Sequence, residues 1–243
     1  MSARVLLELT DVGFTYPGRK RPALEGINFT LEAGQRIGLI GANGSGKTTL
    51  LHLIMGLLRP DTGRLLFQGK PLADRNDLRR LRKAIGLLFQ DADDQLFSPT
   101  VLEDVAFGPL NLGADPAEAR EIALRTLDRV GLHGFGPRVT HKLSGGEKKL
   151  VSLATVLAMS PQALLLDEPS NNLDPATRED LIRILNQLGI GYVIISHDWD
   201  FLAETCEEIF AMEQGRLARS DHASLHQHRH AHPCGEHPHH HGC

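Results

Sequence analysis

A glycine-rich run that begins at residue 41 carries the clearest chemical signal in the sequence. Residues 41–48 fit the pattern G-x-x-x-x-G-K-[ST], between a predicted buried strand at 36–41 and a helical pattern that continues to Pro60. In such a loop backbone N–H groups converge on phosphate oxygens, Lys47 adds a cation, and the Thr48 hydroxyl can hold magnesium. The run therefore predicts a phosphate-binding loop. The residues expected to form it are Gly41, Ala42, Asn43, Gly44, Ser45, Gly46, Lys47, Thr48 and Thr49.

Two adjacent carboxylates form a second candidate element. Asp167 and Glu168 follow the apolar run 163–166, which predicts a buried strand. From a strand end, Asp167 can reach a bound magnesium ion while Glu168 points towards an attacking water molecule. Such a pair can also be an ordinary strand end, but the phosphate-binding loop in the same chain favours a shared site.

Alternating strand and helix patterns predict the scaffold that positions these residues. Apolar runs at 163–167 and 192–196 predict strands, and the segments 147–159 and 175–188 predict helices, in the order of a mostly parallel α/β sheet. Residues 1–36 contain short apolar runs broken by Pro and Gly, which predict a small separate sheet. The other predicted elements are a strand pair from Arg64, a basic helix at 77–83, a strand at 85–89 and a helix at 116–131.

Composition restricts the class of protein. Of the 243 residues, 41% are hydrophobic and 23% are charged, as in globular domains rather than disordered or fibrous chains. The net charge of −4 provides no basic field for duplex nucleic acid, so we expect no nucleic acid partner. No run reaches the roughly 18 apolar residues that span a bilayer, and the first residues do not read as a secretory signal. Three cysteines are too few for a disulfide framework. These features predict a cytosolic protein.

Histidines are concentrated at the end of the chain. Nine of the 13 lie in residues 221–243, which lack apolar periodicity, so we expect a disordered tail that binds a transition metal through imidazole and thiolate groups. An engineered affinity tag and an incidental polar tail are the alternatives. The candidate metal ligands are His226, His228, His230, His232, Cys234, His237, His239, His240 and His241.

A third motif, Leu143-Ser-Gly-Gly-Glu147, lies between the two phosphate-site elements. Ser144 and Glu147 have the S-x-x-E spacing of a capping box, and the two glycines leave N–H groups exposed at a helix start that can bind phosphate. With this motif the sequence resembles the ATP-binding cassette (ABC) family over residues 4–219. The resemblance implies a P-loop NTPase cassette of the α/β class, with a mostly parallel core sheet, a small antiparallel β subdomain and a helical signature subdomain.

The same resemblance implies domain limits and an oligomeric state. Residues 1–220 correspond to an ATP-binding domain whose helical subdomain covers about 91–160, and residues 221–243 form the tail. Two subunits, identical or related, are expected to dimerise head to tail, so that Ser144, Gly145 and Gly146 of each close over ATP bound to the other. Asp174 matches the loop that crosses this interface. ATP and Mg²⁺ are the expected cofactors.

Further site residues follow from the resemblance, position by position. Tyr16 resembles the aromatic residue that stacks on adenine. Gln90 resembles the glutamine that senses magnesium and the attacking water, and His197 resembles the switch histidine that contacts the terminal phosphate. The implied catalytic residues are Glu168, His197, Lys47 and Gln90, and the implied magnesium ligands are Thr48, Gln90 and Asp167.

Residues 89–112 are similar to the corresponding stretch in ATPases of energy-coupling-factor importers, especially the cobalt and nickel group. In the family this stretch faces the membrane partner. The resemblance implies a peripheral ATPase subunit on the cytoplasmic face of the cell membrane. With a transmembrane coupling subunit and a substrate-binding membrane subunit, it would import nickel or cobalt. The alternatives are import of another micronutrient, a soluble ABC ATPase without a membrane partner, and a metal-storage protein with vestigial ATP binding.

Overall fold

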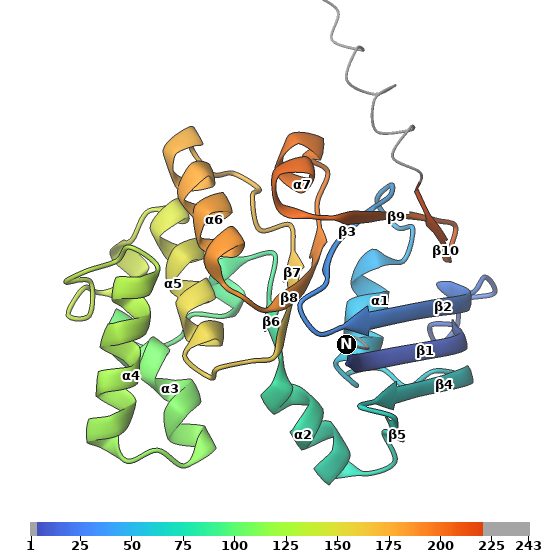
Figure 1. Ribbon diagram of the computed structural model, residues 1–243, viewed down its shortest axis with the longest axis horizontal. Coiled ribbons are helices and arrows are strands. Elements are labelled where there is room, and N and C mark those ends of the chain that lie inside the picture. Colours follow the sequence, from blue (N-terminus) through green and yellow to red (C-terminus); the bar gives the residue numbers. More distant parts are fainter. Residues whose placement is uncertain (1–3, 221–243) are drawn as a thin grey trace, which may run out of the picture.

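Two β-sheets form the scaffold of the structure, a computed structural model that describes residues 4–220 (Figure 1). The core sheet is parallel except at one edge strand. In spatial order its strands are β10 (Arg216–Arg219), β9 (Glu208–Glu213), β3 (Arg36–Ile40), β8 (Gly191–Ile195), β7 (Ala163–Asp167) and β6 (Ile85–Leu88), with β10 antiparallel. The second sheet is antiparallel, and its order is β2 (Leu24–Glu32), β1 (Val5–Phe14), β4 (Thr62–Phe67) and β5 (Lys70–Pro71).

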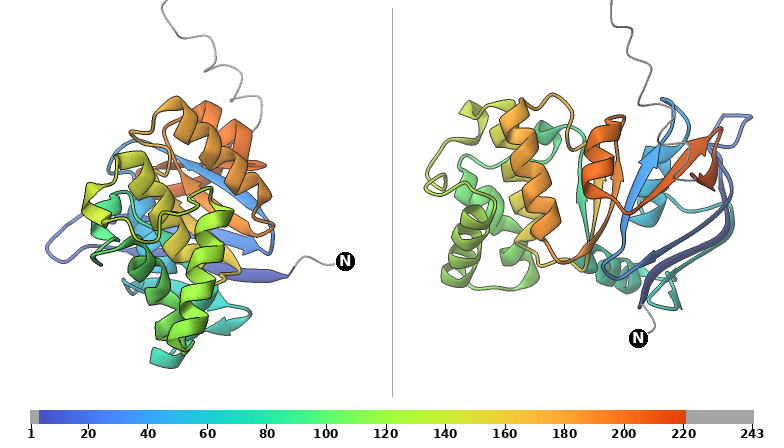
Figure 2. Two further views of the ribbon diagram at one scale, coloured as in Figure 1. Left: turned by 90° about the vertical axis from the view of Figure 1, so that its left-hand side faces the viewer. Right: turned by 45° about the horizontal axis from the view of Figure 1, so that its top comes forward.

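The helices divide between the two sides of the core sheet. The bounds are α1 (Lys47–Ile54), α2 (Arg75–Ala84), α3 (Val101–Leu112), α4 (Pro116–Arg129), α5 (Gly145–Leu157), α6 (Pro175–Gln187) and α7 (Trp199–Thr205), with 3₁₀ turns η1 (Ala92–Asp94) and η2 (Thr140–Lys142). Figure 2 shows α3, α4 and α5 grouped on one side, with the antiparallel sheet on the other. The expected fold class, an α/β cassette with an antiparallel β part and a helical part, is confirmed.

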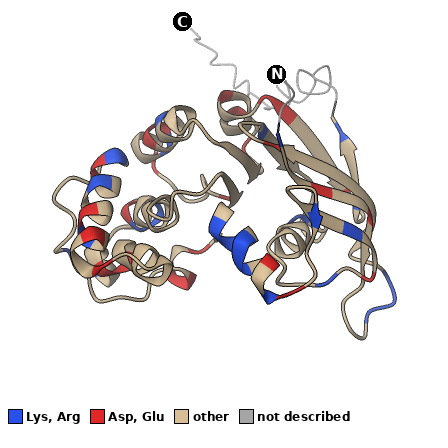
Figure 3. Cartoon of the chain, turned by 60° about the horizontal axis from the view of Figure 1, so that its bottom comes forward, with Lys and Arg blue, Asp and Glu red and all other residues tan. Residues whose placement is uncertain are grey.

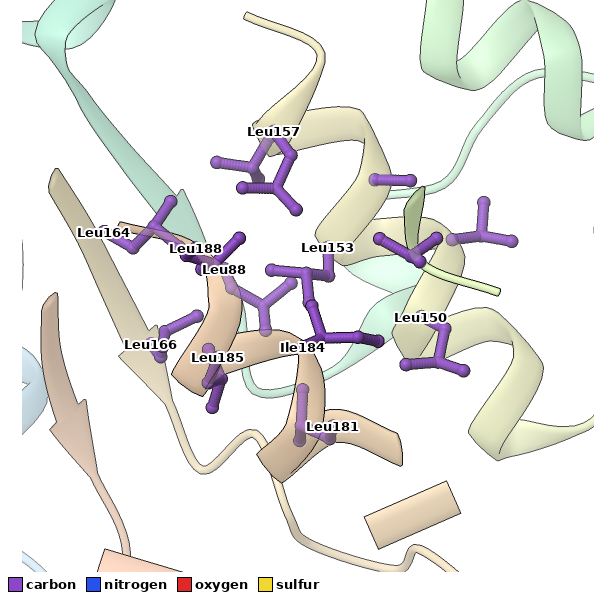
Figure 4. Close-up of a cluster of buried hydrophobic side chains, with 14 of the residues drawn as sticks. Leu88, Leu150, Leu153, Leu157, Leu164, Leu166, Leu181, Ile184, Leu185 and Leu188 are labelled. Carbon is purple, nitrogen blue, oxygen red and sulfur yellow. The ribbon is translucent and has the colours of Figure 1, made fainter. Parts of the chain in front are cut away.

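The core sheet separates two apolar clusters. Every residue of β7 is buried, and successive side chains of a strand point to opposite faces. Leu164 and Leu166 therefore join the cluster around α5 and α6, which Figure 4 shows, whereas Ala163 and Leu165 join the cluster under the antiparallel sheet. A strand buried on both faces reads as a continuous apolar run, which is why the sequence identifies it.

Side-chain caps fix where the helices begin. Asp74, Thr100 and Ser144 each form a capping box with the acidic residue three positions later, and these boxes start α2, α3 and α5. The capping box predicted for Ser144 and Glu147 is confirmed, and it places the start of α5 at Gly145 rather than at residue 147. Lys and Arg gather on α2 (Figure 3), the helix predicted as basic.

Two helices differ from the sequence expectation. The first helix ends at Ile54 and does not continue to Pro60, because Gly56 adopts a left-handed conformation with φ 62°. The helix α3 lies inside the expected helical subdomain but was not predicted as a separate helix, since Gly108 and Pro109 interrupt a helical pattern. A larger residue would be crowded at position 108, because its Cβ would lie 2.6 Å from Cγ of Met159. Within residues 4–220, no helix is both long and apolar enough to cross a membrane.

The packing of α5 against the core sheet yields a stability prediction. Leu153 on α5 is fully buried in the cluster of Figure 4, so Leu153→Ala should lower the free energy of unfolding by about 2–5 kcal/mol through lost contacts and a residual cavity. Leu57→Ala is the control, because Leu57 is 51% exposed. Urea denaturation measures both. Equal losses in the two variants would contradict the burial of α5.

Candidate functional site

The glycine-rich run forms a tight loop between β3 and α1. Gly41 and Gly46 have φ values of 149° and 114°, in the left-handed range that favours glycine. A Cβ on Gly41 would overlap the carbonyl oxygen of Met212, and one on Gly46 would lie 2.7 Å from the carbonyl oxygen of Ala23. Only glycine therefore fits at these two positions, and the loop can curve around a ligand with its N–H groups directed inward.

Lys47 lies inside the curve of the loop. Its side chain is nearly buried, and Nζ donates to the carbonyl oxygens of Gly41 at 2.6 Å and Ala42 at 3.1 Å. Burial lowers the pKa of this ammonium, whereas the carboxylates of Glu168 and Asp167 act in the opposite direction. The buried Ser45 hydroxyl has no hydrogen-bond partner. The buried cation fits the anionic oxygens of a phosphate group.

Thr48 and Asp167 form an oxygen-rich pair beside the loop. The Thr48 hydroxyl donates to Oδ2 of Asp167 at 3.1 Å, so the end of β7 meets the start of α1. Burial raises the pKa of the Asp167 carboxyl, against the lowering effect of the Thr48 hydrogen bond. Gln90, directly after the end of β6, lines the same cavity. Hydroxyl, carboxylate and amide oxygens fit the ligand preference of Mg²⁺.

Glu168 and His197 pair at the ends of two neighbouring strands. Nε2 of His197 lies 3.1 Å from Oε1 of Glu168, and the His197 backbone N–H donates to Oε2 at 3.4 Å. Glu168 has a φ of 47°, a strained conformation for a residue with a side chain, and its N–H donates to the Ile195 carbonyl at 2.9 Å. Burial raises the pKa of the Glu168 carboxyl, against the lowering effect of His197. A carboxylate with a raised pKa is suited to accept a proton.

These residues surround one cavity of about 630 Å³. The predicted site residues that line it are Tyr16, Asn43, Gly44, Gly46, Lys47, Thr48, Thr49, Gln90, Asp167, Glu168 and His197. The other loop residues, Gly41, Ala42 and Ser45, border a cavity of about 410 Å³ behind the loop. The structure thus brings the glycine loop, the acidic pair and the histidine together, although they are far apart in the sequence.

Ser144, Gly145 and Gly146 do not line this cavity of their own chain. The Ser144 hydroxyl accepts the Glu147 N–H at 3.2 Å, and the Glu147 carboxylate accepts the Ser144 N–H at 2.8 Å. Gly145 borders a neighbouring cavity of about 600 Å³ that shares Thr48, Gln90 and Asp167 with the first. Asp174 caps α6, with its carboxylate accepting from the hydroxyl and the N–H of Thr177. Ser144 and Gly145 are therefore exposed at a helix start next to the site rather than within it, whereas Gly146 is buried.

Three cations in the cavity wall were not predicted. Arg19, Lys20 and Arg21 line the large cavity close to Tyr16. Their sequence signal is a run of three consecutive basic residues after the turn at Pro17 and Gly18, directly beyond the predicted aromatic contact. The histidine and cysteine ligands predicted in the tail lie outside the residues that the structure describes.

Comparisons with known proteins agree with this site. Residues 24–171 match the family model described as ABC transporter. The energy-coupling factor transporter ATP-binding protein EcfA of Methanothermobacter thermautotrophicus is 44% identical over 216 residues, which cover 87% of this chain and 69% of the relative. The cobalt import ATP-binding protein CbiO of Syntrophus aciditrophicus is 39% identical over 219 residues, covering 89% of this chain and 78% of the relative.

A solved structure shows the same architecture. The structure of cbiO1 from Clostridium perfringens, described as part of the ABC transporter complex cbiONQ, matches with a TM-score of 0.83 at 35% identity. The match covers 93% of this chain and 92% of that chain. The two chains therefore share their fold over nearly their whole lengths.

The place of Tyr16 yields a binding prediction. Its ring packs edge-on against Phe14, with centroids 4.9 Å apart, and stays 39% exposed in the cavity wall. Tyr16→Ala should weaken ATP binding by about tenfold or more, because stacking on a base is worth about 1–3 kcal/mol. Titration calorimetry measures the change.

Two controls separate adenine stacking from other effects of the substitution. Tyr16→Phe should bind ATP normally although it loses the 3.2 Å contact to the Thr49 hydroxyl. Inorganic tripolyphosphate, which has no base, should bind the unmodified chain and both variants alike. Equal losses for both ligands would contradict adenine stacking.

Proposed function

The chain belongs to the ABC transporter family and is an ABC ATPase, and on this premise we propose that it is the ATP-hydrolysing subunit of an importer for nickel or cobalt ions. The observation that carries the ATP-hydrolysing part of the proposal is the convergence of Lys47, Asp167, Glu168 and His197 on one cavity. We assign residues 1–220 to the ATP-binding domain, with a helical subdomain at about 91–160, and residues 221–243 to a metal-binding tail.

Each residue around the cavity receives a role in ATP binding. The glycine loop and Lys47 hold the phosphates, while Tyr16 stacks on the adenine. Thr48, Gln90 and Asp167 would hold Mg²⁺, which neutralises charge on the terminal phosphates when bound. Thr48 and Asp167 support this assignment, because their oxygen atoms lie 3.1 Å apart at the edge of the phosphate loop.

Glu168 and His197 are assigned to the hydrolytic step. Glu168 accepts a proton from the attacking water, which adds to the terminal phosphorus as the bond to ADP breaks. His197 holds the Glu168 carboxylate in place through the 3.1 Å contact and presents its ring to the terminal phosphate. Lys47 stabilises the charge that develops on the phosphate oxygens, because it is already buried in the curve of the loop.

The second half of each site is proposed to come from another ATPase subunit, identical or related. The start of α5, with Ser144, Gly145 and Gly146, is a helix N-terminus that can bind an anion, and it does not line the large cavity of its own chain. In a head-to-tail dimer it closes over the partner's ATP, with the Asp174 loop at the interface. Since only the closed dimer gains both sets of contacts, ATP binding favours closure.

Coupling to transport is proposed to use residues 89–112. Phe97 is 67% exposed and packs against Phe107, which is 46% exposed. Exposed aromatic residues in one patch are typical of protein contacts. We assign this face to a transmembrane coupling subunit that works with a substrate-binding membrane subunit. This places the chain at the cytoplasmic face of the membrane as a peripheral protein.

The cargo assignment rests on three observations. A relative named for cobalt import is 39% identical, residues 89–112 resemble the cobalt and nickel group, and the tail is rich in imidazole groups, which suit nickel and cobalt. The name EcfA of another relative favours the second candidate function, an energy-coupling-factor ATPase for a different micronutrient.

Glu168 provides a test of the hydrolytic step. Glu168→Gln should lower the ATP turnover number by about 10²–10⁴-fold, because the amide cannot accept the proton. ATP binding should survive, since the phosphate loop is unchanged, and the variant should accumulate as an ATP-bound dimer in size-exclusion chromatography. Glu179→Gln, at an exposed position of α6, is the control and should hydrolyse ATP normally. Rapid turnover by Glu168→Gln would refute the role of Glu168.

Metal uptake tests the cargo. Cells that express the membrane partners with the full chain should accumulate nickel or cobalt, and accumulation should stop with Glu168→Gln. A chain truncated after Asp221 should import less only at low external metal if the tail collects metal ions. Elemental analysis of washed cells, with zinc as the control metal, measures uptake. ATP hydrolysis without movement of nickel or cobalt would overturn the cargo assignment and leave the ATPase in place.

A further inference from the structure

A buried lysine outside the predicted site contacts the backbone of Gln90. Lys149 lies in the second turn of α5 and is only 4% exposed. Its Nζ donates to the carbonyl oxygen of Gln90 at 2.6 Å and to that of Phe89 at 3.3 Å. A buried ammonium group is costly unless hydrogen bonds satisfy it, so these two carbonyls are the reason that the charge is tolerated there.

A second side chain fixes the same dipeptide from its other side. Oε1 of Gln95 accepts the backbone N–H of Phe89 at 3.2 Å. Its Nε2 donates to the carbonyl oxygen of Ser152 and to the hydroxyl of Thr155, each at 2.8 Å, and both residues belong to α5. Both carbonyl groups of residues 89–90 and the N–H of Phe89 are therefore linked to α5 through the side chains of Lys149 and Gln95.

These bonds replace the sheet ladder. The pairing of β6 with β7 ends at Leu88, so Phe89 and Gln90 lie beyond the last residue that the core sheet holds. Beyond the sheet the backbone groups of Phe89 and Gln90 instead bond to the side chains of Lys149, on α5, and Gln95, which is itself bonded to α5. The position of Gln90 in the cavity wall is consequently set from the signature helix as well as from the strand before it.

Lys148, the preceding residue, shows that this arrangement is specific to Lys149. Its side chain is 19% exposed, and its Nζ pairs at 2.6 Å with Oδ1 of Asp93, whose side chain is 68% exposed. Burial lowers the pKa of the Lys149 ammonium, whereas the carboxylates of Asp91, Asp167 and Glu168 act in the opposite direction. The two adjacent lysines thus differ in burial and in partner.

We propose that Lys149 is a positioning residue, which places the Gln90 side chain in the nucleotide cavity by holding the Phe89 and Gln90 carbonyls against the signature helix. The inference rests on the role given to Gln90 in the proposed function. Because Ser144 begins the same helix, Gln90 and the signature motif keep a fixed relation to each other. Lys149 itself does not line the large cavity and borders only the neighbouring one.

The test measures ATP hydrolysis by the full chain. Lys149→Met keeps the length of the side chain and removes every donor, so turnover should fall about ten- to a hundredfold, the loss that displacement of a catalytic group by about 1 Å can cause. Affinity for ATP should stay within about twofold, because the phosphate loop is untouched. Lys149→Arg should restore most of the turnover, since its guanidinium donates to two acceptors. Lys148→Met is the matched control and should behave as the unmodified chain.

A double-mutant cycle separates positioning from general support of the fold. In a Gln90→Ala background, Lys149→Met should cause little further loss of turnover, because the group that it positions is already gone. Gln95→Met removes the other side chain that links residues 89–90 to α5, and it should show the same non-additivity with Gln90→Ala. If Lys149→Met fails to fold in a thermal melt, the result for Gln95→Met decides whether these links position Gln90.

The outcomes distinguish this inference from the proposed function. Additive losses of turnover, or normal turnover in Lys149→Met together with a defective Gln90→Ala, would overturn the positioning role alone. Normal turnover in Gln90→Ala would overturn the role given to Gln90, and the positioning role of Lys149 with it.

Discussion

The backbone turn between β3 and α1 is the constraint on which the rest of the site depends. Its left-handed glycines let the chain reverse around Lys47, and the close approach of Met212 to Gly41 leaves no room for a side chain. The turn is also held from the far end of the described chain, because the Gly215 N–H donates to the Ser45 carbonyl at 2.9 Å. The loop is therefore fixed before any ligand binds, and preorganised N–H groups bind phosphate without a further ordering cost.

The order of strands converts this loop into a complete site. Four neighbouring strands of the core sheet, β3, β8, β7 and β6, each end at the site. The glycine loop follows β3 and His197 follows β8. Asp167 and Glu168 lie at the end of β7, and Gln90 follows β6. Ligands of parallel α/β sheets bind outside this edge of the sheet. The strained φ of Glu168 and its bond to Ile195 bring the carboxylate within reach of His197 on the next strand.

The helical part adds a second level of control. Its helix α5 presents Ser144 at one end and buries Lys149 one turn later, so a single helix bears both the exposed phosphate-binding start and the anchor for residues 89–90. The cluster of leucines in Figure 4 holds this helix against β7 and α6. Displacement of α5 would therefore move Gln90. It would leave the glycine loop in place, because the loop leads into α1 on the other side of the sheet.

The sequence by itself determined the elements whose signals are local. The glycine loop, the buried strand before Asp167 and the Ser144 capping box follow from residue types at fixed spacing, and the family resemblance and fold class that rested on them are confirmed. Only the tertiary structure decided that α1 ends at Ile54, that α3 forms despite Pro109, and that Arg19 to Arg21 line the cavity. It also decided that Lys149 is buried and Lys148 is not, because hydrogen bonds between residues some 60 positions apart leave no periodic trace in a sequence.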